Sequence, residues 1–262
     1  MIDEIKSGVI PDPRTEEAKE LDYTHIAGST IVNWREKPYT EWKRYTQRFQ
    51  DGSSSCVFQA IAKAFETVLG YPVSASSYFW RMFYPNPGSY LQDGFHIAIK
   101  RYFATEADEP SNNQTEQYMN TIRPLKTTLL GLSYYQPDFR DIDQIAQAIE
   151  QYGHCVLTFA SLNEEWTLTP QYSGVKTKWG HAICAVDYSL IGNVKTLICE
   201  DSTGQGSSPT GLRLITKDFL EKRASGAGYF TGVEDIRTLT EKLKDIAMKI
   251  IQILQDKIKK LL

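Results

Sequence analysis

The change of hydrophobic pattern part-way along the chain constrains its fold more than any other feature. In the first half, apolar residues recur at helical spacing from Val57 to Leu69, and Gly70 stops the pattern. A helical pattern over 141–153 follows, and after it apolar runs of strand type occur at 155–160, 181–187, 195–199 and 212–215. A helix-rich half followed by a strand-rich half predicts an α+β chain of two lobes.

The composition argues against two kinds of partner. The chain has 262 residues with 29 basic and 32 acidic side chains, so its formal net charge of -3 offers no electrostatic basis for binding nucleic acid. No apolar run reaches the length that spans a bilayer, so we expect no transmembrane segment. The first residues lack the basic and apolar regions of a signal peptide.

The four cysteines indicate a reducing environment. Cys155, Cys184 and Cys199 lie inside the apolar strand-like runs, where a free thiol behaves as a small hydrophobe. None of the four forms a C-x-x-C pair, and no other pattern indicates a metal or a cofactor. We therefore expect no metal site and a location in the cytoplasm or in a phage-type particle.

The two ends of the chain differ in character from the middle. Residues 1–28 are polar with two prolines and predict a loosely packed arm. Residues 234–262 carry apolar side chains at spacings of three and four with charges between them, which predicts an amphipathic helix. Such a helix either packs on the domain or on a second copy, or docks on a membrane surface or a virion.

Cys56 is placed for nucleophilic chemistry. It follows three serines, which are good N-cap residues, and stands at the start of the first helical pattern. Unpaired N–H groups at a helix N-terminus favour a thiolate. Gln50 lies six residues upstream across a turn and could donate an amide N–H to an oxyanion.

A thiol nucleophile also needs a base, and the chain has four histidines. His25 lies in the polar arm, His96 follows Gly94 near the start of a short helical pattern, and His154 precedes Cys155. His181 opens the most apolar strand-like run, directly after Trp179 and Gly180. A histidine at the edge of an apolar run is more often structural than catalytic, so its position alone does not choose the base.

Five segments in order resemble the papain-like (C1-type) cysteine peptidase family. QDGSSSC at 50–56 is similar to the turn in which a Gln lies six residues before the nucleophilic Cys, and VNWR at 32–35 resembles the V-D-W-R segment upstream of it. Gly94 and the following helix resemble the glycine stretch that lines the substrate cleft. WGHAICAVDY at 179–188 looks like the strand that carries the base, and EDSTG at 200–204 resembles K-N-S-W-G. The likeness spans roughly residues 31–230 of this chain and is that of a distant member of the family.

The resemblance implies a fold, a reaction and a set of site residues. It implies a helical lobe at about 50–120 and an antiparallel β-barrel-like lobe at about 121–233, together a domain over 29–233. It implies that Cys56 attacks a peptide carbonyl with His181 as base, Asp201 orienting His181, and Gln50 in the oxyanion hole. Further substrate contacts are implied for three residues: Gly94, Trp179 and Gly180.

Two departures from the family bear on the third catalytic residue. Asp201 stands where the family has Asn. An aspartate at this position still fixes the tautomer of His181 and favours its imidazolium form. Thr203 stands where the family has a shielding Trp, so we expect a wetter Asp201 with a looser hold on His181.

Two other functions use the same residues. An acyl transferase of the transglutaminase or arylamine acetyltransferase kind has Cys, His and Asp in this chain order, although Gln50 and the VNWR segment favour a peptidase. A papain-like shell that has lost catalysis could serve as a binding or structural protein. The presence of Cys56, His181 and Gln50 together argues against that second alternative.

Overall fold

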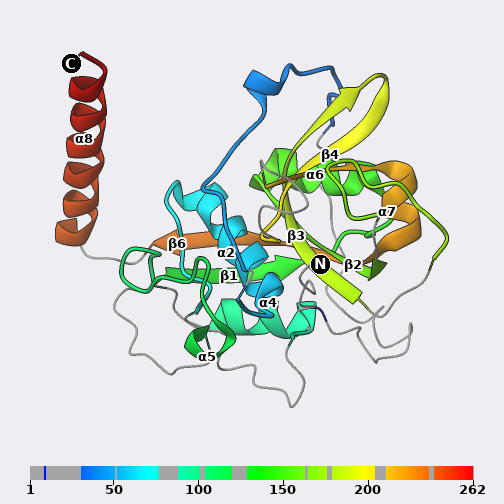
Figure 1. Cartoon of the computed structure of the whole chain (residues 1–262), viewed down its shortest axis with the longest axis horizontal. Coiled ribbons are helices and arrows are strands. Elements are labelled where there is room, and N and C mark those ends of the chain that lie inside the picture. The colour runs from blue at the N-terminus through cyan, green and yellow to red at the C-terminus, as the bar shows by residue number, and fades with distance from the viewer. Residues whose placement is uncertain are drawn as a thin grey trace.

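A computed structural model describes most of the chain (Figure 1). The described residues are Val9, 31–50, 52–76, 88–100, 104–119, 129–162, 165–175, 179–203, 211–235 and 239–261. Apart from Val9, the arm predicted at 1–28 lies outside these ranges, as does His25. The division of the chain into an arm, two lobes and a terminal segment therefore stays a prediction.

The strands form one open antiparallel sheet. Its order is β1-β6-β2-β3-β4-β5, and each neighbouring pair is antiparallel. The strands are β1 (Leu129–Tyr135), β2 (Cys155–Leu162), β3 (Trp179–Ile191), β4 (Val194–Glu200), β5 (Leu212–Thr216) and β6 (Ala224–Asp235). Since β1 and β5 are edge strands of this sheet, the predicted barrel-like closure is wrong for the described residues, whereas the α+β class is confirmed.

Helices cover both faces of the sheet (Figure 1). The helices of the described residues, of which α2, α4, α6 and α7 pack on the sheet, are η1 (Tyr39–Glu41), α2 (Cys56–Leu69), α4 (Leu91–Lys100), α5 (Glu116–Met119), α6 (Ile142–Tyr152), α7 (Lys217–Arg223) and α8 (Leu239–Leu261). Successive β3 residues alternate between two cores: Ala182 and Cys184 pack with α2 and α4, whereas Ile183 and Ala185 pack with α6 and α7. A strand buried on both faces reads as a continuous apolar run, which explains the sequence HAICAV.

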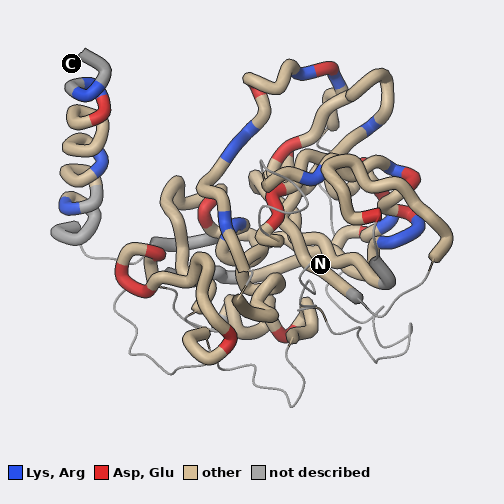
Figure 2. The backbone as a smooth tube through the Cα atoms, viewed as in Figure 1, with Lys and Arg blue, Asp and Glu red and all other residues tan. Residues whose placement is uncertain are grey.

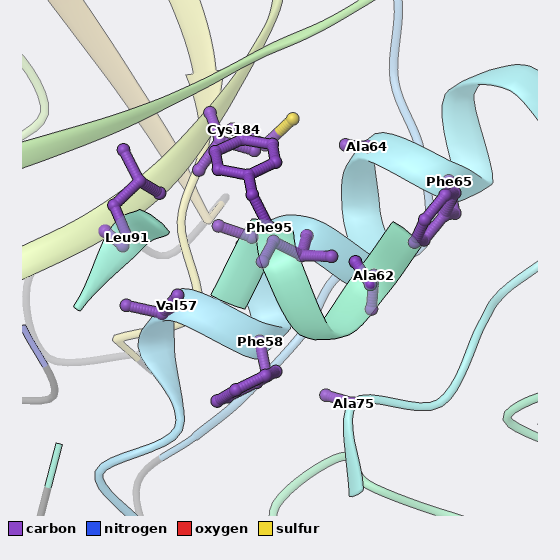
Figure 3. Packing of buried hydrophobic residues seen from close by; sticks show 14 of the residues in the cluster. Val57, Phe58, Ala62, Ala64, Phe65, Ala75, Leu91, Phe95 and Cys184 are labelled. Carbon is purple, nitrogen blue, oxygen red and sulfur yellow. The ribbon is translucent and has the colours of Figure 1, made fainter. Parts of the chain in front are cut away.

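Helix α2 forms from the strongest helical pattern of the chain. It begins at Cys56, and Gly70 ends it in the left-handed conformation, as the sequence predicts. Phe95 of α4 lies close to α2 in the same core, together with Cys184 (Figure 3). Gly94 permits this approach, because a Cβ there would lie 2.8 Å from side-chain atoms of both Val57 and Ile61.

The other predicted elements are present with shifted bounds. Helix α6 begins after Asp141, whose carboxylate accepts from the N–H groups of Asp143 and Gln144. Helix α4 begins at Leu91, so Gly94 lies inside it and does not precede it. The short helical pattern expected after Gly94 misses this first turn because Gln92 and Asp93 interrupt the apolar spacing.

Helix α8 confirms the amphipathic pattern near the C-terminus. It stands to one side of the sheet (Figure 1), and Lys249 donates a hydrogen bond to the Gly70 carbonyl over 3.3 Å. Its apolar side chains, Leu243 and Ile250 among them, are about half exposed. A role in oligomerisation or docking stays a prediction. Among the described residues, none of the helices is both long and apolar enough to cross a membrane.

Charged side chains of both signs alternate over the described chain. Figure 2 shows acidic and basic residues interspersed along the same segments, in keeping with the near balance of the composition. The absence of a nucleic-acid partner stays a prediction from the composition.

Candidate active site

Cys56 is the first residue of α2 and is fully buried. The turn before it is held by the Ser53 N–H donating to the Gln50 carbonyl over 2.6 Å. Gly52 is required there, because a Cβ would lie 2.4 Å from the carbonyl oxygen of Gln114. Cys56 therefore stands at the N-terminus of α2, the end of a helix where the macrodipole is positive.

His181 connects Cys56 to Asp201. Strand β3 carries it opposite Phe159 of β2, and its Nε2 lies 2.6 Å from Oδ1 of Asp201. Burial alone would lower the pKa of His181, but the negative charge of Asp201, with a further contribution from the Cys56 side chain, raises it from 6.5 to about 9. His181 is therefore an imidazolium at neutral pH and lies between an acid and a thiol.

Asp201 is buried and held from several sides. Its Oδ2 accepts from Trp166 Nε1 over 3.1 Å and from Thr203 Oγ1 over 2.6 Å, and it lies 2.8 Å from Nη2 of Arg213. Burial opposes ionisation, but the charges of His181 and Arg213 hold the pKa of Asp201 well below its usual range. The expectation of a wetter Asp201 with a looser hold on His181 is therefore wrong.

Gln50 ties the turn before Cys56 to the segment that carries Asp201. Its backbone N–H donates to the Ser202 carbonyl over 2.8 Å, and its side-chain Oε1 accepts from Ser202 Oγ over 2.5 Å. Because the carbonyl end of the amide faces Ser202, the Nε2 end is the group that remains to donate elsewhere. Cys56, His181 and Asp201 thus interact directly, and Gln50 joins them through Ser202.

Comparisons with known proteins identify the fold. No family model and no curated protein matches the chain. Xylellain, a cysteine protease from Xylella fastidiosa, has a similar structure with a TM-score of 0.66 and 15% identity, over 87% of this chain and 96% of that one. Digestive procathepsin L 3 of Tenebrio molitor gives a TM-score of 0.61 at 15% identity, over 81% of this chain and 74% of that one.

Bromelain from Ananas comosus is a third structure of the same kind, with a TM-score of 0.54 and 15% identity over 71% of this chain and 93% of its own. The chain has the papain-like cysteine protease fold. The neighbours are cysteine peptidases. At this level of identity the likeness establishes the fold, so the chemistry must be argued from the residues at the site.

Two residues of this papain-like site were missed by the sequence patterns. Trp166, between β2 and β3, lies edge-on to His181 with ring centroids 5.6 Å apart, and it shields the side where Thr203 replaces the expected Trp. Arg213 lies over the Trp166 ring at 5.2 Å. The signal for Arg213 was present: a single arginine inside the apolar run LRLI predicts a buried partner of opposite charge.

The three residues expected to contact substrate lie in different surroundings. Gly180 is buried in β3 beside His181, and Trp179 is the first residue of that strand. Gly94 packs α4 against α2, as described above. For all three, a substrate contact stays a prediction. Within the described ranges, there is no cluster of three or more His, Cys, Asp or Glu side chains that could hold a metal ion.

Val9 lies against the residue that precedes His181. Its carbonyl oxygen would be 3.3 Å from a Cβ on Gly180, and it forms a parallel bridge with Ser89 just before α4. Val9 is 9% exposed and belongs to the core that contains Cys56. If Gly180 contacts substrate as predicted, Val9 occupies part of the same space.

Replacing Val9 with aspartate is therefore expected to increase the rate at which iodoacetamide alkylates Cys56. An unpaired carboxylate is costly to bury, so the substituted residue should leave the core and open access to Cys56. The increase should be at least about tenfold, because this cost exceeds about 1.4 kcal/mol, the free energy that corresponds to a tenfold change. Val194→Asp is the matched control, since Val194 is 47% exposed and begins β4. Equal alkylation rates in wild type and Val9→Asp would show that Val9 does not limit access to Cys56.

Proposed function

We propose that the protein is a cysteine peptidase that hydrolyses peptide bonds through a thioester on Cys56. The observation that carries the proposal is the chain of contacts from Cys56 through His181 to Asp201 at the start of a helix in a papain-like fold. This arrangement supplies a thiolate, a proton donor and a fixed orientation for that donor. The predicted partner is a peptide or protein substrate.

In the first step the Cys56 sulfur attacks the peptide carbonyl carbon and the carbonyl oxygen becomes an oxyanion. The side-chain amide of Gln50 and the N–H of Cys56 are the proposed donors to that oxygen. The His181 imidazolium then gives its proton to the leaving amine as the C–N bond breaks, which leaves a thioester and a neutral imidazole.

In the second step a water molecule attacks the thioester carbon. His181 takes a proton from the water, so the imidazolium forms again. The C–S bond breaks, the acid product leaves, and Cys56 returns to the thiolate. Asp201 holds Nε2 of His181 in both steps, so the other ring nitrogen is the one that exchanges the proton.

The test combines covalent labelling with a hydrolysis assay. We expect a peptidyl epoxide to modify Cys56 alone, because Cys56 contacts the His181 imidazolium, whereas burial raises the pKa of the Cys155, Cys184 and Cys199 thiols. We also expect wild type, but not Cys56→Ser, to cleave a mixed peptide library in buffer without an added amine. Labelling is read by mass mapping and cleavage by the new N-termini.

The other outcomes each have a meaning. Rapid labelling of Cys56 with turnover only when a primary amine is added would favour the acyl transferase. Labelling of Cys56 no faster than that of the other cysteines would contradict the peptidase and leave a papain-like scaffold with a binding role. Residence in the cytoplasm or in a phage-type particle agrees with four thiols that form no disulfide and stays part of the same proposal.

A further inference from the structure

Arg213 is fully buried next to the Asp201 carboxylate. Its Nη2 lies 2.8 Å from Oδ2 of Asp201 and donates to Thr203 Oγ1 over 3.1 Å, and its Nη1 donates to the Leu212 carbonyl over 3.0 Å. The guanidinium also stacks over the Trp166 ring. Strand β5 thus brings a permanent cation to the oxygen of Asp201 that His181 does not use.

The Asp201 carboxylate therefore lies between two cations. His181 occupies Oδ1 at 2.6 Å and Arg213 occupies Oδ2 at 2.8 Å, and all three side chains are at most 1% exposed. In such surroundings charges interact far more strongly than in water. A carboxylate alone would bind the imidazolium tightly, whereas a carboxylate already paired with an arginine carries little net charge toward the ring.

We propose that Arg213 is a positioning residue for the reaction proposed above: it fixes Asp201 and lowers the proton affinity of His181. The Asp201–Arg213 pair then presents less negative charge to the ring than Asp201 alone would. This inference rests on the proposed peptidase function, because it concerns how readily His181 gives up its proton to a leaving amine.

The acid strength of His181 explains why a second cation is useful. Asp201 holds the pKa of His181 at about 9 even with Arg213 present. A still higher pKa would make the imidazolium a weaker general acid at neutral pH, since proton donation is most efficient when the pKa lies near the working pH. Arg213 counteracts this effect, because its positive charge offsets part of the negative charge that Asp201 presents to His181.

The experiment compares wild type with Arg213→Gln, which removes the charge but keeps a donor, and Arg213→Lys, which keeps the charge. Two readouts are taken: the NMR titration of the His181 ring, and kcat/KM against pH for a peptide that wild type cleaves. We expect Arg213→Gln to raise the His181 midpoint by about one pH unit or more. Its kcat/KM should fall about tenfold at neutral pH, while Arg213→Lys should recover most of the wild-type profile.

A control and a second background guard against loss of folding. Arg223→Gln disrupts a buried pair with Glu165, where the N–O distance is 2.5 Å, and should leave the His181 midpoint unchanged. If Arg213→Gln does not fold, Asp201→Asn is compared with Asp201→Asn/Arg213→Gln. Because the Arg213 charge opposes protonation of His181 in either background, the double variant should have the higher midpoint.

An unchanged or lower midpoint on removal of Arg213 in the background that folds would overturn the inference. So would an equal loss of activity in Arg213→Lys and Arg213→Gln, since that pattern indicates a purely steric role. If wild type cleaves no peptide, the proposed function fails, yet the NMR titration still decides whether Arg213 controls the proton affinity of His181. The two failures are therefore distinguishable.

Discussion

Replacing His181 with alanine is expected to lower kcat/KM for peptide hydrolysis by about 10²–10⁴-fold, the range that a positioned general acid or base supplies. The variant loses the ring that contacts Cys56 and the group that gives a proton to the leaving amine. It also loses the imidazolium beside the thiol, so iodoacetamide should alkylate Cys56 more slowly at pH 6 than in wild type. Mass mapping measures the rate.

His154→Gln is the matched control for this variant. His154 is also buried, but burial lowers its pKa to about 4, so it is neutral at working pH. Its ring nitrogens lie 3.1 Å from Thr67 Oγ1 and 3.0 Å from the Phe230 N–H, which joins α2 to β6. We expect His154→Gln to lose stability but to keep rapid labelling of Cys56. Wild-type labelling in His181→Ala would contradict the assignment of the base.

The His181–Asp201 pair also links stability to pH. The folded-state pKa of His181 is raised to about 9 from 6.5, so the folded protein binds a proton that the unfolded chain releases between these values. The stabilisation from this pair is complete below pH 6.5 and is lost as the pH rises through about 9. The same range should limit the proposed peptidase reaction, because an imidazolium is needed to protonate the leaving amine.

Replacing Lys63 with methionine is expected to cause the largest loss of stability, about 3–5 kcal/mol, as when one partner of a buried ion pair is removed. Lys63 lies on α2, and its Nζ is 2.9 Å from Oε2 of Glu66 and 2.8 Å from Oε2 of Glu200. All three side chains are buried. Glu200 directly precedes Asp201, so this cluster fixes α2 against the strand that leads to the site.

Thermal and urea unfolding measure this effect. At about 2–4 °C per kcal/mol for a chain of this size, the midpoint should fall by about 10 °C. Burial alone would raise the pKa of Glu66, but Lys63 lowers it overall, so the stabilisation is present above pH 4.5 and lost as the pH falls. Lys217→Met is the control: its pair with Glu221 is exposed at a distance of 3.6 Å, and a change within about 0.5 kcal/mol is expected.

A loss below 1 kcal/mol in Lys63→Met would mean that the apolar contacts of α2 alone hold it on the sheet. The comparison with Lys217→Met separates burial from charge, because both variants remove one ammonium from an ion pair on a helix. Only the buried pair leaves carboxylates in a medium of low polarity without their nearest cation, since Arg48 is 4.0 Å from Glu66 and Arg44 is 3.6 Å from Glu200.

The local patterns predicted the elements that depend on neighbours in sequence. The helix from Cys56 to Leu69 and its glycine stop follow from apolar spacing, and Asp141 at the start of α6 follows from its carboxylate. The strand-like runs match β2 to β5 in order, with ends shifted by a few residues. The pattern did not predict α7 and β6, because KDFLEKR is short and ASGAGYFTGVED is rich in glycine.

What lay beyond the sequence is the way distant segments meet. A strand pattern does not state its partners, so the pairing of β6 with β1 and β2 and the open sheet were visible only in the structure. Likewise, Thr203 suggested an exposed Asp201, whereas Trp166 reaches the same place from another segment. A shielding residue is specified by its position in space, and several segments can supply it.

The sequence by itself determined that Cys56 begins a helix and that His181 lies near the start of a buried strand, because both depend on the period of apolar side chains around them. Only the tertiary structure decided the electrostatic state of the site. The pKa of His181 depends on Asp201, and Asp201 depends on Arg213 from another strand. Charge interactions in a buried site act through distances of a few ångströms, and those distances between remote residues exist only after the chain has folded.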